Sequence, residues 1–185
     1  MAEKIRIETP FTVEQSKKLK AGDSVLITGT IISARDAAHK VMCEALARGE
    51  KLPVDWKNEI VYYLGPTPAK PGDPIGSCGP TTAGRMDAYT PTMLAQGIKG
   101  MVGKGSRSPE VVEAMKKHGV TYFAAVGGAA ALIAKSVKKY EVVGYPELGP
   151  EAVAKLTVED FPCIVVIDSE GNNFYEMGQK PYRRL

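Results

Sequence analysis

The sequence predicts an α/β fold, a single domain with a mixed sheet, from its length, its hydrophobic patterning and its C-terminal end. A chain of 185 residues, 44% hydrophobic and 24% charged, can bury a sizeable core and has the composition of an ordinary globular domain. Through the middle of the chain, strand-like segments alternate with segments of helical periodicity, as in parallel strands joined by helices. Near the C-terminus, two strand-like segments flank the turn Ser169-Glu170-Gly171-Asn172, which favours an antiparallel hairpin.

The first third of the chain predicts two strands and two helices. Residues 5–7 alternate isoleucine with charge, which indicates an edge strand, and residues 11–19 form a short amphipathic helical segment. Residues 24–32 form a long β-branched run whose nearly continuous apolar character predicts burial on both faces. In residues 35–48 the apolar positions recur at helical spacing, and Gly49 supplies the helix end.

The central part predicts two further strands, separated by an irregular loop and a helix. Residues 58–64 have strand character, whereas residues 65–74 contain four prolines and predict an irregular loop. A helix is expected through residues 92–96, and a short strand over residues 98–102.

A strong helix-start signal opens the last part of the chain. Ser108 can cap the helix, Pro109 suits its first position, Glu110 complements the helix dipole, and Gly119 ends the helix. The remaining expected elements are a strand over 121–126, an alanine-rich helix over 129–135, strands over 137–144 and 163–168, and a strand over 173–177 that pairs back as a hairpin.

Charge and cysteine content exclude several classes of protein. The net charge is +3 and the 24 basic residues are dispersed, which does not favour nucleic-acid binding. Cys43, Cys78 and Cys163 lie far apart and form no CxxC pair, so we expect no disulfide framework and no complete metal site within this chain. Without a signal-peptide pattern or a membrane-length apolar segment, the sequence predicts a soluble, cytoplasmic protein.

One stretch is unsuited to a regular helix or strand. It reads Gly76-Ser77-Cys78-Gly79-Pro80-Thr81-Thr82-Ala83-Gly84-Arg85-Met86-Asp87. The hydroxyl of Thr81 and the guanidinium of Arg85 are four residues apart, which places them on one face of a helical turn. A hydroxyl beside a fixed cation suits a small anionic ligand.

Three cations, Arg35, Arg85 and Lys104, are each predicted at a strand-to-helix junction. Such junctions meet at the carboxyl ends of the strands, where open α/β sheets bind ligands. A crevice with three cations would favour a compact dianion. The alternatives are structural: Arg35 can pair with Asp36, Arg85 can pair with Asp87, and Lys104 can simply occupy a Gly-Lys-Gly turn.

Other polar residues have open roles. Thr81 and Thr82 can each cap the following helix, or one of them can act as a base if local positive charge stabilises its alkoxide. His39 and His118 are interpreted as structural or solvent-facing, because nothing pairs either with a nucleophile. Cys78 is expected to be a small buried residue.

Several motifs, in this order, resemble the β-type module of the iron–sulfur hydro-lyases, that is, class I fumarases and L-tartrate dehydratases. The resemblance covers residues 24–177, and the Gly79–Asp87 string favours the fumarase branch. The motifs are Thr28-Gly29-Thr30, Arg35-Asp36-Ala37-Ala38-His39, Gly79-Pro80-Thr81-Thr82-Ala83-Gly84-Arg85-Met86-Asp87 and Gly103-Lys104-Gly105.

This resemblance implies a swivelling β/β/α fold that comprises one hydro-lyase module, residues 1–185. In two-subunit members, the β subunit pairs with an α subunit in an α2β2 assembly. That α subunit holds a [4Fe–4S] cluster on three cysteines, and the fourth iron acts as a Lewis acid on the substrate. The implied reaction is the reversible hydration of fumarate to (S)-malate. The alternatives are L-tartrate dehydration and, more remotely, a non-catalytic anion-binding domain.

The resemblance also implies roles for individual residues. Arg35, Arg85 and Lys104 match the positions that grip the dicarboxylate, and Thr81 matches the base that removes the C3 proton of malate. The acid that handles the C2 hydroxyl is expected from the α subunit. Ser106 stands where many relatives have asparagine, so the resemblance implies no role for it.

Overall fold

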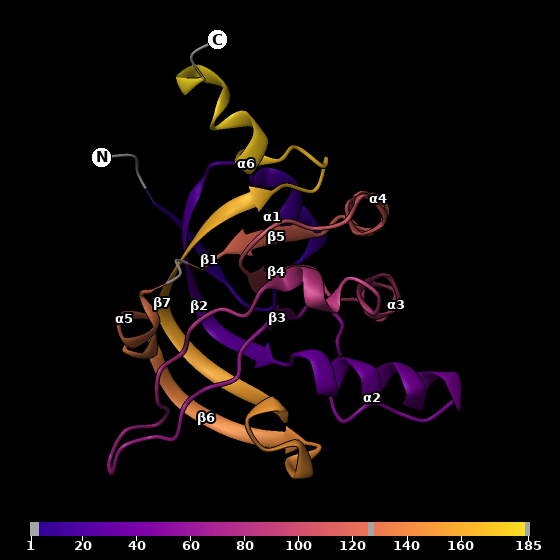
Figure 1. Cartoon of the computed structure of the whole chain (residues 1–185), viewed down its shortest axis with the longest axis vertical. Coiled ribbons are helices and arrows are strands. Elements are labelled where there is room, and N and C mark those ends of the chain that lie inside the picture. Colours follow the sequence, from indigo (N-terminus) through magenta and orange to yellow (C-terminus); the bar gives the residue numbers. More distant parts are fainter. Residues whose placement is uncertain (1–3, 126–127, 184–185) are drawn as a thin grey trace.

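The computed structural model describes residues 4–125 and 128–183 and contains one seven-stranded sheet within these residues (Figure 1). The strands are β1 (Ile5–Glu8), β2 (Ser24–Ser33), β3 (Ile60–Tyr62), β4 (Gly100–Gly103), β5 (Thr121–Ala124), β6 (Val137–Gly144) and β7 (Val153–Ile167). The α-helices are α1 (Val13–Lys18), α2 (Asp36–Ala47), α3 (Thr90–Leu94), α4 (Pro109–His118), α5 (Ala130–Ala134) and α6 (Phe174–Met177). The 3-10 helices are η1 (Ala83–Met86), η2 (Pro146–Glu151) and η3 (Lys180–Tyr182).

The sheet is mixed, and it closes on itself. Strands β1 to β5 run parallel in that order, whereas β7 is antiparallel to β2, β5 and β6. Closure depends on β2, because one edge pairs with β7 along most of its length while the other edge pairs first with β1 and then with β3. The prediction of an α/β fold with a mixed sheet is confirmed.

Alternate residues of the central strands serve two different cores. Tyr62 and Phe123 point into the closed sheet, where they pack with residues of β2 and β7. Their neighbours Val61 and Tyr122 point to the opposite face, as the period of two in a strand requires. There they pack against the helices α2, α3 and α4, which lie along one side of the sheet in Figure 1. Two sheet layers and one helical layer result.

The helix-start signal around Ser108 is confirmed. The Ser108 hydroxyl accepts a hydrogen bond from the Val111 N–H at 3.4 Å, and Pro109 occupies the first turn of α4. Gly119 follows α4 with a φ of +63°, a left-handed conformation that favours glycine and ends the helix.

Two predictions near the C-terminus differ from the structure. The strand expected over 163–168 is only the end of the fifteen-residue β7, whose first part alternates buried and exposed residues up to an irregular position at Asp160 with φ +49°. The return strand expected over 173–177 is wrong, because only Asn173 bridges to Ile167. The Asn173 side chain then accepts the Tyr175 N–H and starts helix α6 instead.

The other elements agree with the predictions apart from their ends. Strand β3 is shorter than residues 58–64, and α3 begins two residues before the expected 92–96 segment. The strand expected over 121–126 includes Val126, which lies outside the described residues.

No described helix combines the length and the apolar character that a membrane crossing needs.

Candidate active site

The segment around Thr81 is held against the carboxyl end of β4 by backbone hydrogen bonds. The Thr81 N–H donates to the Tyr63 carbonyl at 2.8 Å, and the Lys104 N–H donates to the Thr81 carbonyl at 3.3 Å. The Ala83 N–H in turn donates to the Lys104 carbonyl at 2.8 Å, so that Thr82 and Lys104 form a parallel bridge. Two segments far apart in the sequence therefore lie side by side, with the predicted base and the predicted lysine on them.

Gly103 permits this close approach. A Cβ atom at this position would lie 2.9 Å from Cδ2 of Tyr63 and 3.1 Å from the Cβ of Ala83. Real Cβ atoms essentially never show the first of these distances, and the second is unusually tight, so a side chain here would force Tyr63 or the segment around Ala83 to move.

Two predicted arginines meet at one carboxylate. The Arg35 Nε lies 3.1 Å from Oδ2 of Asp36, and the Arg85 Nε lies 2.8 Å from Oδ1 of the same residue. Arg35 also pairs through Nη2 with Oε1 of Glu151 at 3.1 Å. We call Arg35, Asp36, Arg85 and Glu151 the open cluster, because 21% of the Arg35 side chain and 53% of the Arg85 side chain are exposed.

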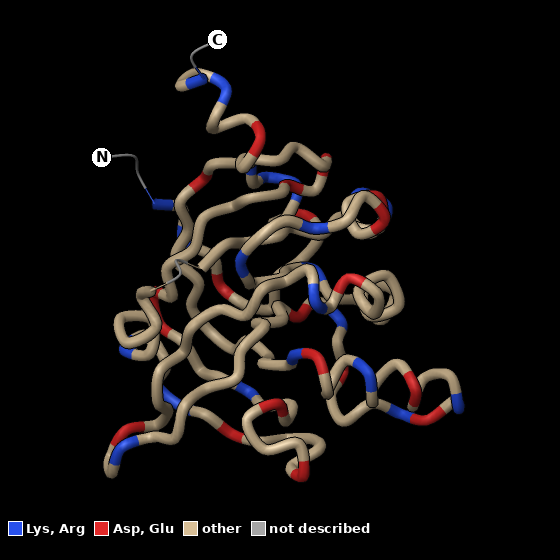
Figure 2. Tube along the Cα trace, in the orientation of Figure 1, with Lys and Arg blue, Asp and Glu red and all other residues tan. Residues whose placement is uncertain are grey.

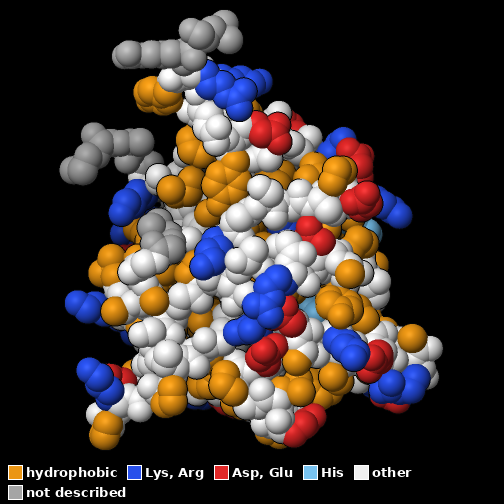
Figure 3. Space-filling view, viewed as in Figure 1, with side chains coloured by type: hydrophobic (Ala, Val, Ile, Leu, Met, Phe, Trp, Pro, Cys, Tyr) orange, Lys and Arg blue, Asp and Glu red, His pale blue; other side chains and the backbone are white. Residues whose placement is uncertain are grey.

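The ion pairs of the open cluster test the pairings that the sequence predicts for Arg35 and Arg85. Arg35 does pair with Asp36, as its structural interpretation predicts. The pairing of Arg85 with Asp87 is wrong, since Arg85 pairs with Asp36 instead. Figure 3 shows the face of the molecule that is seen in Figure 1, and near its middle Lys and Arg side chains gather among Asp and Glu side chains.

Glu151 is a member of this cluster that sequence reasoning missed. Its Oε2 accepts the Ala37 N–H at 2.9 Å, so this carboxylate from η2 occupies the N-terminus of α2 while it holds Arg35. Arg35 also lies close to Gly65, where a Cβ would be 2.5 Å from Nη1. The guanidinium of Arg35 is thus fixed from two sides.

Lys104 and the two threonines have few side-chain partners. Lys104 is exposed and forms no ion pair within residues 4–125 and 128–183. Thr82 precedes η1, but its hydroxyl makes no capping hydrogen bond, so the cap interpretation is wrong for Thr82. Thr81 is half-buried, and Thr82 is exposed.

A second arginine cluster lies beneath the same segments. The Nε of Arg107 lies 2.7 Å from Oδ1 of Asp87, and its Nη2 donates to the hydroxyl of Thr90 at 2.8 Å. We call Arg107, Asp87 and Thr90 the buried cluster, because none of the Arg107 side chain is exposed. The signal that singled out Arg35, a cation at a helix start, also applies to Arg107, which directly precedes the cap of α4.

His39 lies between the two clusters and is buried. Its Nδ1 is 3.0 Å from the Arg35 carbonyl, and its ring contacts that of Tyr63 edge-on at 5.5 Å. Burial lowers the pKa of His39 from its ordinary value of 6.5 to about 4, so the imidazole is neutral at neutral pH. This environment agrees with a structural role.

The cysteines are unsuited to ligate a cluster. Cys78 is buried, and burial raises the pKa of its thiol to about 12, while burial also raises the pKa of Cys43 and of Cys163. Metal ligation needs thiolates, and no group of three or more His, Cys, Asp or Glu side chains gathers anywhere in the described part of the chain. The residues present therefore do not fit an iron–sulfur cluster.

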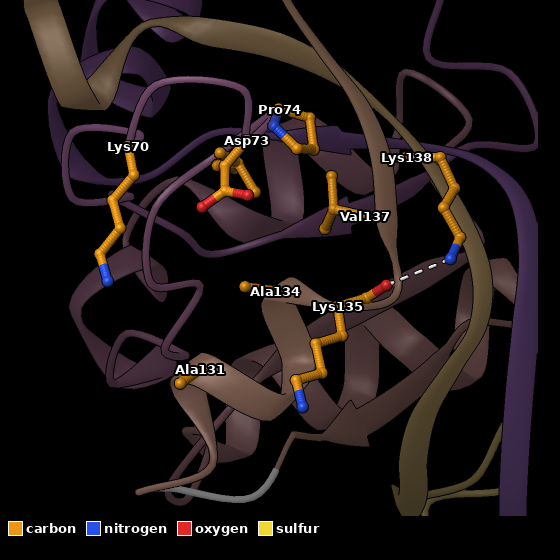
Figure 4. A pocket seen from close by; sticks show the side chains of 9 residues that line it. Lys70, Asp73, Pro74, Ala131, Ala134, Lys135, Val137 and Lys138 are labelled. Atoms are coloured by element: carbon orange, nitrogen blue, oxygen red, sulfur yellow. Dashed lines mark hydrogen bonds between the residues drawn. The ribbon is translucent and has the colours of Figure 1, made fainter.

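A cavity of about 640 Å³ lies away from these residues, between the proline loop and the α5–β6 junction (Figure 4). Lysines 70, 135 and 138 line it, but Lys138 donates to the Lys135 carbonyl at 3.2 Å. It contains none of the predicted site residues. Over the described residues, Lys and Arg are interspersed with Asp and Glu along the trace, without a large region of one sign (Figure 2).

Comparison with known proteins gives one family. The model of the fumarase C-terminus matches residues 1–178. The class I aerobic fumarate hydratases of Salmonella typhimurium and Escherichia coli K12 are 44% and 47% identical, over 90% and 83% of this chain. The chain spans only 29% and 28% of their lengths. The putative L(+)-tartrate dehydratase subunit beta of Methanocaldococcus jannaschii is 44% identical, over 95% of this chain and 93% of its own length.

Proposed function

This chain belongs to the fumarase C-terminus family, and we propose that it is the β subunit of a fumarate hydratase, which converts fumarate and water reversibly to (S)-malate. Relatives named as fumarate hydratases and as a tartrate dehydratase subunit support a hydro-lyase. The near-complete overlap with a separate subunit beta supports a chain that works with a partner subunit.

The observation that carries this proposal is the joining of Arg35 and Arg85 by Asp36, beside the Thr81–Lys104 ladder. Arg35, Arg85 and Lys104 carry three positive charges, whereas Asp36 and Glu151, the partners of the two arginines, carry two negative charges, so these five residues have an excess of positive charge. The Arg85 Nε lies 2.8 Å from Oδ1 of Asp36, and about half of the Arg85 side chain is exposed. Its remaining N–H groups suit one carboxylate of a dicarboxylate, and Lys104 suits the other.

In this proposal, Thr81 is the base in the malate-to-fumarate direction. The C3 proton moves to the alkoxide Oγ1 of Thr81, and the C3–H electron pair forms the C2–C3 double bond. The C2–O bond breaks while the acid expected from the α subunit donates a proton to the departing hydroxyl, which leaves as water. A threonine alkoxide needs nearby positive charge, which Arg85 and Lys104 supply. The same cations stabilise the negative charge that builds on the substrate carboxylate. In the hydration direction, Thr81 returns the proton to C3.

A partner α subunit provides the rest of the site in this proposal. The family resemblance implies that it holds the [4Fe–4S] cluster and donates the acid for the C2 hydroxyl. The cysteines of this chain do not fit the cluster. In this proposal, this chain contributes the base and the cations that bind the dicarboxylate. We further propose an α2β2 assembly in the cytoplasm, with residues 1–185 as one module.

Reconstitution tests this function. The chain is purified anaerobically with its α partner, the cluster content is measured, and fumarate consumption is followed by absorbance. We expect malate as the product, with activity that requires both chains. A complex with a fully loaded cluster and no fumarate hydration would refute the proposal.

L-Tartrate dehydration is a second candidate, favoured by the 93% coverage of the archaeal subunit beta. The ratio of kcat/KM for fumarate and for L-tartrate in the same complex decides between them. A higher kcat/KM for L-tartrate would assign the chain to the dehydratase.

A further inference from the structure

The buried cluster holds a charge where water cannot reach it. Beyond its bonds to Asp87 and Thr90, the Arg107 guanidinium lies between two aromatic rings, 5.4 Å from the centre of Tyr63 and 5.1 Å from that of Tyr122. Both are cation–π contacts, which are strongest when the cation is desolvated. The Arg107 Nη1 donates to the Tyr63 hydroxyl at 3.5 Å and to Sδ of Met101 at 3.3 Å, so each nitrogen of this guanidinium has a partner.

Asp87 connects two chain segments through this cluster. One oxygen accepts Nε of Arg107 at 2.7 Å, and the other accepts the Ser108 N–H at 2.7 Å. Asp87 ends the segment that carries Thr81 and Arg85, whereas residues 107 and 108 belong to the connection that follows Lys104. One carboxylate thus ties together the two segments of the candidate site.

The aromatic partners of Arg107 hold the same two segments. The Tyr63 carbonyl accepts the Thr81 N–H at 2.8 Å, and the Tyr122 hydroxyl donates to the carbonyl of Gly105 at 3.0 Å. Gly105 is adjacent to the predicted lysine. Arg107 therefore packs between two residues that each bind one of the two segments.

Stability alone does not explain a buried charge at this place. Well-packed apolar residues are often as stabilising as a buried ion pair, because removing two charges from water is costly. A planar guanidinium with a fixed fork of donors does, however, define orientation, which an apolar side chain does not.

We propose that Arg107, acting through Asp87, is a positioning residue that sets the distance between Thr81 and Arg85 on one segment and Lys104 on the other. This role rests on the proposed function for its catalytic consequence, but the mechanical link between the segments can be tested separately.

Hydrogen exchange tests the link itself. We would compare the wild type with Arg107→Lys and Asp87→Asn, each as the full chain with any partner that co-purifies. We expect faster exchange in residues 79–87 and 103–108 together, and unchanged exchange in α2. Arg48→Lys is the matched control, because Arg48 forms an exposed pair with Glu50. Faster exchange in one segment only, in neither, or throughout the chain would overturn the proposal.

Kinetics of the reconstituted complex test the consequence. We expect the KM for fumarate to rise and kcat/KM to fall about 10- to 100-fold in Arg107→Lys, the size of effect found when a group that orients a site residue is replaced. A purely structural role would lower the active fraction, and with it the apparent kcat, at unchanged KM, and this result would overturn the proposal. If Arg107→Lys does not fold, Asp87→Asn provides the same readout.

The two experiments fail in different ways. A wild-type complex inactive on both fumarate and tartrate would refute the proposed function, while the exchange experiment still decides whether Arg107 links the segments.

Discussion

The open cluster and the buried cluster both contain arginine–aspartate pairs, but they differ in their contact with water. In the open cluster, Arg35 and Arg85 share Asp36, and part of each arginine side chain remains accessible. In the buried cluster, Arg107 is enclosed, and Asp87 uses both oxygens within the protein. Spare, partly solvated donors are suited to an anionic ligand, whereas a saturated and dry pair is suited to holding geometry.

The two clusters lie close together because each contains one residue of the same short segment. Arg85 and Asp87 are two residues apart. The Arg85 side chain belongs to the open cluster, and the Asp87 side chain belongs to the buried cluster. The short helix η1 turns these side chains in different directions. This segment therefore exposes the cation of Arg85, while the carboxylate of Asp87 binds it to the buried Arg107.

The largest expected effect is on catalysis, from Thr81→Ala. In the reconstituted complex, kcat should fall about 10²- to 10⁴-fold, because the C3 proton loses its acceptor. Fumarate hydration at saturating substrate measures this change. The matched control is Thr82→Ala, which removes an exposed hydroxyl one residue away and should change kcat by less than about threefold. Equal losses in both variants would contradict the choice of base, and an unaffected Thr81→Ala would favour the non-catalytic anion-binding domain.

The next effect is on stability and separates the two clusters directly. Arg107→Met should lower the free energy of unfolding by about 3–5 kcal/mol, because it leaves a largely buried carboxylate at Asp87 without its cation. Arg85→Met removes a half-exposed cation and should change it by no more than about 1 kcal/mol. Urea unfolding of both variants measures the difference. Equal losses would mean that the clusters do not differ as described.

A double variant sharpens this comparison. Replacing both partners, in Arg107→Met with Asp87→Leu, should recover part of the stability, because no unpaired charge remains. Activity should not recover with stability, since the guanidinium of Arg107 that fixes the two segments is still missing. Recovery of both would show that the pair contributes stability alone.

A smaller effect, on substrate binding, is expected from Arg85→Lys. The KM for fumarate should rise about tenfold if Arg85 binds a substrate carboxylate as proposed, because an ammonium cannot replace a guanidinium that contacts Asp36 and the substrate through separate N–H groups. Steady-state kinetics and urea unfolding together check this prediction, since stability should stay within about 1 kcal/mol. An unchanged KM would remove Arg85 from the dicarboxylate site.

Much of the fold was predictable because the hydrophobic periodicity and the residues that start or end helices indicate the same elements. The starts of α2 and α4 and the strands β2 to β5 follow from such signals. The first part of β7 was not predictable in this way, because Asp160 and Pro162 read as strand breakers. The structure accommodates them, since Asp160 adopts a positive φ where the pairing between β2 and β7 shifts register.

The candidate site was predictable only in part, for a similar reason. Cations at helix starts indicated Arg35, but the sequence does not tell which carboxylate will approach from a distant element. Glu151 comes from η2, and the burial of Arg107 depends on rings from β5 and from the residue after β3. Partners of this kind are set by tertiary packing, which local periodicity does not encode.

The smallest effect concerns pH, and it tests the packing between the clusters. The pKa of His39 is about 4 in the folded chain because of burial, against an ordinary value of 6.5, so the unfolded chain binds its proton more readily. Stability is therefore fully present above pH 6.5 and is lost as the pH falls from 6.5 toward 4. The loss by pH 5.5 should be about 1.4 kcal/mol from this group. Urea unfolding of the wild type at a series of pH values measures it.

His39→Gln isolates this contribution, because other groups titrate equally in both proteins. The difference between the unfolding free energies of wild type and His39→Gln should shrink from pH 7 to pH 5.5 by the amount that His39 loses. His118→Gln is the control, since His118 lies near the end of α4 and is only partly buried, so its difference from the wild type should change much less. A constant difference for His39→Gln would mean that the imidazole takes up its proton as readily in the folded chain as in the unfolded chain. The His39 ring would then carry a positive charge in acid, close to Arg35. The two clusters would be electrostatically coupled rather than separated by a neutral ring.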